Sequence, residues 1–80
     1  MSKVVMGIQL RERTEESTDF QSIISKYGNI IQTRIGLHET ASDSSGIIVL
    51  DFVDNTDSKI DKLEKELSEL GNVNIQKMLF

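Results

Sequence analysis

The feature that most restricts the fold is the spacing of apolar residues, which alternates between strand-like and helix-like periods along the chain. Residues 3–10 place Val4, Met6, Ile8 and Leu10 on one face, the period of two that predicts a half-buried strand. Residues 30–38 show the same period. There the two faces are Ile31, Thr33, Ile35 and Leu37, and Ile30, Gln32, Arg34, Gly36 and His38.

Two stretches repeat their apolar residues at helical spacing. In residues 15–27 these are Phe20, Ile23, Ile24 and Tyr27, and in the second stretch they are Ile60, Leu63, Leu67 and Leu70. Gly28 and Gly71 follow the two stretches, and glycine commonly ends helices. Residues 54–57 are suited to form a turn and a cap before the second helix.

The run of residues 46–53 is almost continuously apolar and rich in β-branched side chains. Such a run is typical of a central strand covered on both faces. The polar residues 39–46 before it predict a mobile hairpin loop. Residues 73–80 predict a final strand.

The predicted order is therefore strand, helix, strand, strand, helix, strand, within 80 residues. Right-handed crossovers convert this order into an α+β fold of the ferredoxin-like βαββαβ kind. We expect one domain over residues 1–80, with a four-stranded antiparallel sheet and both helices on one face. The core of a domain this small is marginal.

A sheet covered on one side leaves an uncovered face, on which we expect Val5, Ile47, Val49 and Val53. Such a patch predicts a homo-oligomer, either a dimer or a tetramer. The alternative is scattered surface hydrophobes. Asp51 and Arg34 are expected on the same face, either as an ion pair in the oligomer interface or as a recognition device for a polar ligand.

Candidate ligand-binding residues are Arg11, Arg13, Arg34 and His38. Arg11 and Arg13 precede the first helix, whose N-terminus attracts anions, although Glu12, Glu15 and Glu16 compete for these arginines. They could therefore hold a small-molecule effector or be neutralised locally. His38 adjoins the polar loop and is either a ligand or a surface residue.

The sequence carries no recognisable catalytic or metal-binding signature. It has no cysteine and one histidine, so a single imidazole with carboxylates is a poor metal constellation. No nucleophile–base pair or glycine-rich phosphate loop is present. We therefore expect neither an enzyme nor a bound metal or cofactor.

The net charge is −4, from 13 acidic and 9 basic residues, and the basic residues are scattered. This argues against direct nucleic-acid binding. No apolar run approaches the length of about 18 residues needed to span a membrane, and no signal peptide is evident. We expect a cytoplasmic protein without membrane contact.

The chain resembles a known family over essentially its whole length, and three segments carry the resemblance. They are residues 30–37, Ile-Ile-Gln-Thr-Arg-Ile-Gly-Leu; residues 46–50, Gly-Ile-Ile-Val-Leu; and residues 63–73, which end in Leu-Gly-Asn-Val. The chain thereby resembles the iron-only hydrogenase system regulators, which are similar to ACT domains and to the C-terminal domain of the nickel-responsive repressor.

The resemblance implies an ACT-like regulatory domain that forms a homo-oligomer and takes part in regulation, either of transcription or of protein activity. Two family features are missing. Residues 11–14 lack the glycine of amino-acid-sensing ACT domains, and His38 alone does not reproduce the nickel site of the repressor. No DNA-binding segment is expected, so regulation would act through another protein or a ligand. The alternatives are a pure protein-interaction module and a small dimeric ferredoxin-like enzyme.

Overall fold

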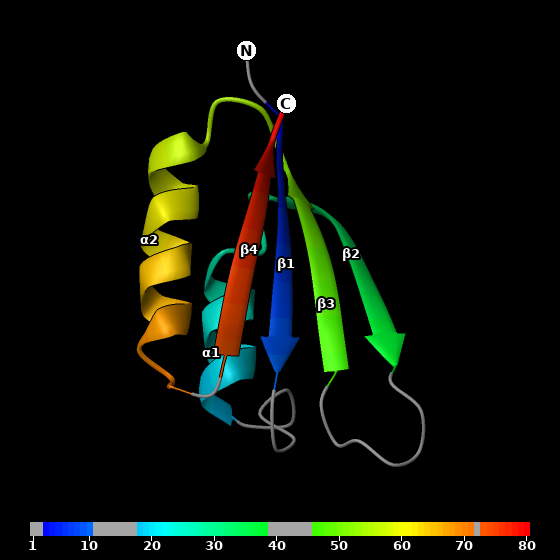
Figure 1. Ribbon diagram of the computed structural model, residues 1–80. Helices are drawn as coiled ribbons and strands as arrows, with labels where there is room; N and C mark the ends of the chain where they lie inside the picture. Colours follow the sequence, from blue (N-terminus) through cyan, green and yellow to red (C-terminus); the bar gives the residue numbers. More distant parts are fainter. Residues whose placement is uncertain (1–2, 11–17, 39–45, 72) are drawn as a thin grey trace.

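The computed structural model describes residues 3–10, 18–38, 46–71 and 73–80. Along the chain its elements are β1 (Val4–Leu10), α1 (Thr18–Lys26), β2 (Ile31–His38), β3 (Gly46–Phe52), α2 (Asp57–Ser68) and β4 (Val73–Leu79). The strands form one antiparallel sheet in the order β2-β3-β1-β4. Both helices lie on the same side of this sheet (Figure 1). This is the α+β, ferredoxin-like βαββαβ arrangement that the sequence predicts.

The boundaries of the four strands each differ from the predicted ones by one residue. The helix predicted over residues 15–27 is described from Thr18 onward, because residues 11–17 lie outside the described part. The loop predicted over residues 39–46 also lies outside it, except for Gly46, which begins β3.

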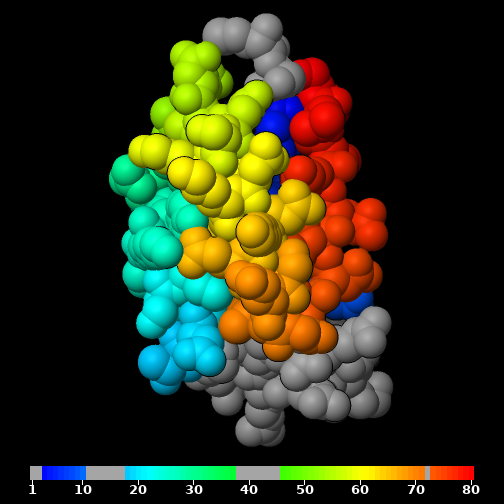
Figure 2. All heavy atoms as spheres, turned by 90° about the vertical axis from the view of Figure 1, so that its left-hand side faces the viewer, coloured from blue at the N-terminus to red at the C-terminus, as the bar shows by residue number. Residues whose placement is uncertain are grey.

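The core lies between the sheet and the helices. In β1 and β3 every second residue is buried, and these residues pack against Phe20 and Ile24 of α1 and Leu63 and Leu67 of α2. β3 is the central strand that its apolar run predicts, and within this chain one of its faces is covered, because Ile47, Val49 and Asp51 alternate with its buried residues and stay half-buried. Figure 2 shows the helix-covered side, where α2 runs beside β4.

The turn before α2 and the glycine after it follow the prediction, whereas the predicted side-chain cap is absent, because Thr56 makes no hydrogen bond to the first turn of the helix. Asn55 has a positive φ of 64°, a conformation that asparagine tolerates better than most residues. The Thr56 hydroxyl donates to the Val53 carbonyl at 2.6 Å. Gly71 follows α2 with a φ of 88°, which only glycine adopts without strain.

Polar contacts fasten the two helices to each other and α2 to β4. Glu66 of α2 accepts a hydrogen bond from the Tyr27 hydroxyl, and its carboxylate lies 3.0 Å from the Lys26 ammonium. Lys77 of β4 lies 2.6 Å from the Glu64 carboxylate. The pKa of Glu66 is held below its ordinary value by the Tyr27 hydrogen bond first and by Lys26 second.

The two ends of the described chain lie side by side (Figure 1). The Lys3 amide donates to the Phe80 carbonyl at 3.0 Å, and the Phe80 amide donates to the Lys3 carbonyl at 2.8 Å. This pair extends the ladder between β1 and β4 by one step beyond Val4 and Leu79.

Replacing Leu63 with alanine is expected to lower the free energy of unfolding by about 3 kcal/mol, because the side chain is fully buried and its loss leaves a cavity. Urea unfolding followed by circular dichroism measures this change. The control is Lys62→Ala on the exposed side of the same helix. An equal loss in both variants would contradict the assigned core.

The depressed pKa of Glu66 predicts how stability depends on pH. A carboxyl whose folded pKa is lowered contributes stability above its unfolded pKa and loses it as pH falls through the folded value. Tyr27→Phe removes the largest cause of the shift, so between about pH 5 and pH 3 its stability should decline less than that of the wild type. Parallel urea titrations across this range test the difference. Identical pH profiles would rule out the Tyr27–Glu66 contribution.

Candidate functional site: the open face of the sheet

The face of the sheet away from the helices presents three rows of residues, which we call the open face. Residues paired directly across neighbouring strands share a face. From β2 to β4 the rows are Thr33, Asp51, Val5 and Met78; Ile35, Val49, Gly7 and Gln76; and Leu37, Ile47, Gln9 and Asn74. No described helix covers these rows.

One corner of the open face is aliphatic. Ile35, Leu37, Ile47 and Val49 form two adjacent pairs across β2 and β3, and we call these four residues the aliphatic patch. Ile35 and Leu37 are each 50% exposed. The other two residues, Ile47 and Val49, are half-buried.

The β2 half of this patch was not anticipated from the sequence. Ile31 pairs with Phe52 and Thr33 pairs with Asp51, so Gln32 is an extra residue in a β-bulge. A bulge shifts the alternation of the strand by one residue. Ile31 therefore shares the helix-covered face, whereas the following odd-numbered residues of β2 face away from the helices. The adjacent apolar residues Ile30 and Ile31 are the sequence signal of this phase change.

The predicted pairing of Arg34 with Asp51 is wrong. Arg34 lies opposite Leu50, whose side chain is buried under the helices, so Arg34 belongs to the other face of the sheet. It is exposed at the β2 edge. The bulge at Gln32 is the physical reason, since it reverses the face assigned to every later residue of the strand.

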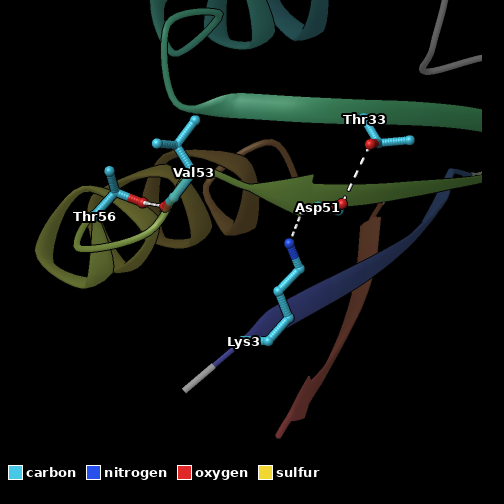
Figure 3. A network of polar contacts seen from close by, with 5 residues as sticks. All are labelled: Lys3, Thr33, Asp51, Val53 and Thr56. Atoms are coloured by element: carbon cyan, nitrogen blue, oxygen red, sulfur yellow. Dashed lines mark hydrogen bonds and ion pairs between the residues drawn. The ribbon is translucent and has the colours of Figure 1, made fainter. Parts of the chain in front are cut away.

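Asp51 instead joins a network at the end of the open face near the chain ends (Figure 3). The Lys3 ammonium lies 2.7 Å from Asp51 Oδ1, and the Thr33 hydroxyl donates to Asp51 Oδ2 at 3.2 Å. The contact with Lys3 is the main cause that lowers the pKa of Asp51. Asp51 is thus held as a carboxylate between β1 and β2.

The opposite corner of the open face carries side-chain amides. Asn74 Nδ2 donates to Gln9 Oε1 at 3.4 Å, and Gln76 Nε2 donates to Asn74 Oδ1 at 3.4 Å. These three residues, which we call the amide row, border a hollow of about 210 Å³ together with Gly7 and Ile47. No sequence pattern predicts this corner, because amides on a strand carry no motif.

The remaining predicted site residues divide into three cases. Val5, Ile47, Val49 and Asp51 lie on the open face as predicted. Val53 lies past the end of β3, where its amide donates to the Ile30 carbonyl at 2.9 Å. Arg11 and Arg13 fall outside the described residues, and the backbone of His38 pairs with Gly46 while its side chain lies outside the described part.

Within the described ranges, no group of three or more His, Cys, Asp or Glu side chains is placed to hold a metal ion. In the same part of the chain, no helix combines the length and apolarity that crossing a membrane requires.

Comparison with known proteins establishes the fold. No protein-family model and no curated protein matches the chain. The uncharacterised protein TM1266 from Thermotoga maritima matches it with a TM-score of 0.74 at 17% sequence identity, covering 100% of this chain and 99% of that one. The two chains therefore share one architecture over their whole length.

The Asp51 network predicts the titration of this carboxyl. Its pKa should lie below the ordinary aspartate value in the wild type and rise in Lys3→Met, because the neighbouring cation favours the charged form. The side-chain carboxyl ¹³C shift, followed by NMR as a function of pH, measures it directly. The control is Arg34→Met, which should leave the titration unchanged. If Arg34→Met raised the pKa of Asp51 more than Lys3→Met does, the result would support the Arg34–Asp51 pairing that the sequence predicts.

Proposed function

We propose that the chain is a non-catalytic regulatory domain of the ACT-like kind, which associates with further copies of itself through the open face and responds to a small-molecule effector. The observation that carries this proposal is the aliphatic patch. Two of its four side chains are half exposed on a sheet face that no described helix covers.

The size of the open face is sufficient for weak self-association. Four strands about 4.8 Å apart and seven residues long, at about 3.4 Å per residue, give a footprint of about 450 Å². Two such faces together provide about 900 Å², which is below the range of about 1,200–2,000 Å² of stable interfaces and corresponds to a weak or transient one. At about 25 cal/mol per Å², burial of a few hundred Å² of apolar surface contributes several kcal/mol, against the cost of lost rigid-body freedom.

The polar groups around the patch support a specific orientation of two copies. The Lys3–Asp51 pair lies in the row next to the patch, and a charge buried without its partner is heavily penalised. Only arrangements that keep this pair together, or hydrate it, remain favourable. A two-fold arrangement buries the same patch on both copies and leaves none exposed.

The regulatory role, and its connection with a hydrogenase system, rest on the sequence resemblance in residues 30–37, 46–50 and 63–73. In that view the domain acts on transcription through another protein or through its effector rather than by contacting DNA. The net charge of −4 favours such an indirect route.

Sedimentation equilibrium at micromolar concentrations tests the association. The wild type should sediment as a dimer or a dimer of dimers, and Val49→Asp should shift it toward monomer because an isolated charge at the centre of the interface is costly. Ile35→Lys should act in the same direction. Because Ile35 is half exposed on the edge strand, this second variant leaves the core intact.

The matched control is Ser22→Asp, which adds the same charge to an exposed position on α1 and should leave the mass unchanged. Circular dichroism of each variant verifies that it is folded. A monomeric wild type, or folded Val49→Asp and Ile35→Lys variants that both stay assembled, would overturn the proposed interface.

A further inference from the structure

Gly7 occupies a position in the middle of a central strand where none of the usual structural reasons for glycine applies. β1 pairs with β3 on one side and β4 on the other, and both registers run through Gly7 without a shift, so no bulge is present. Among the described glycines, the positive φ belongs to Gly71. A Cβ added at Gly7 would meet only the Gln76 carbonyl, at 3.9 Å, which is ordinary contact.

A larger residue would therefore fit at this position and would favour the strand, because glycine in a strand interior weakens it. The remaining reason for glycine is close approach of something from outside the chain. The space left by the missing side chain is the floor of the hollow of about 210 Å³.

The lining of this hollow indicates an uncharged occupant. Its five residues are Gly7, Gln9, Ile47, Asn74 and Gln76, none of which is ionisable. The hollow is smaller than the range of about 300–1,000 Å³ typical of drug-sized ligands, so it suits a single small ring. The partly exposed backbone of Gly7 provides a flat surface against which such a ring can lie.

The hydrogen bonds of the amide row leave several donors and acceptors unused, because each side-chain amino group carries two N–H groups. Asn74 bridges Gln9 and Gln76. The row thus ends in the amino group of Gln9 and the carbonyl of Gln76, neither of which has a protein partner among the described residues. A ligand that carries both a carbonyl and an N–H can therefore bond to amides of this row.

We propose that this hollow binds a small, uncharged, planar ring with an amide edge, as in pyrimidine bases and lactams. The proposal names the class of effector for the proposed regulatory function. Its site adjoins the aliphatic patch, since Ile47 belongs to both.

Titration of ¹⁵N-labelled protein with uracil tests the proposal. Shift changes should be confined to the five lining residues, including the side-chain amides, with a Kd of about 1 mM as expected for a fragment of this size. The matched control ligand is 1,3-dimethyluracil, which keeps the ring and both carbonyls but has no N–H and should bind at least about tenfold more weakly.

Gly7→Val fills the floor of the hollow and should abolish the uracil shifts while raising the urea midpoint, because valine is the better strand residue. A loss of binding together with higher stability excludes unfolding as its cause. Gln76→Leu removes the free acceptor and should weaken uracil binding about tenfold.

The uracil titration is repeated on the Ile35→Lys variant, so that the test of the hollow does not depend on self-association. Localised shifts in either protein support the hollow, including when the wild type is monomeric and the proposed interface has failed. The proposal is overturned if neither protein shows localised shifts, if dimethyluracil binds equally well, or if Gly7→Val still binds. In the first case a second copy that approaches Gly7 closely is the remaining explanation for the glycine.

Discussion

Burial of alternate residues of β1 and β3 beneath two helices is the interaction on which the rest of this structure depends. Met6, Ile8 and Leu50 are almost completely shielded from solvent, and they contribute much of the apolar area that an 80-residue chain has available. Because both crossovers bring their helices to the same side, the same pattern that builds the core also leaves the opposite face bare. The core and the open face are therefore two results of one alternation.

The two corners of the open face are connected through Ile47. The aliphatic patch favours apolar contact with another surface, whereas the amide row offers hydrogen bonds to a small polar molecule. A ligand seated beside an association surface changes the free energy of association if it contacts the two states differently. Under the proposed function, this proximity gives a direct route from effector binding to oligomer assembly, without any rearrangement of the core.

The sequence predicted the elements well because each is determined by local spacing. Phe20, Ile24, Leu63 and Leu67 repeat at helical intervals, and all four are buried. It predicted the face of Val5, Ile47 and Val49 correctly for the same reason. It failed for β2, where the extra residue Gln32 exchanges the two faces for the rest of the strand.

That failure has a physical origin, since register depends on the neighbouring strand as well as on the pattern within one strand. The partner of Asp51 was missed as a consequence, because Thr33 and Lys3 are remote from it in sequence and only pairing brings them together. The hollow could not be predicted from local sequence patterns either. Its importance depends on what a side chain at Gly7 would have touched, and that is known only once β4 is in place.

The backbone pairing of Lys3 with Phe80 has a mechanical consequence. The two residues lie on neighbouring antiparallel strands at the same end of the sheet. A force that pulls them apart acts along the hydrogen bonds between β1 and β4, which run perpendicular to the strands. These bonds would break one after another from that end, as in a zipper, rather than resist together in shear. The domain should therefore open at low tension when stretched from its ends. The β1–β3 pairing at its centre would bear load only after β1 and β4 have separated.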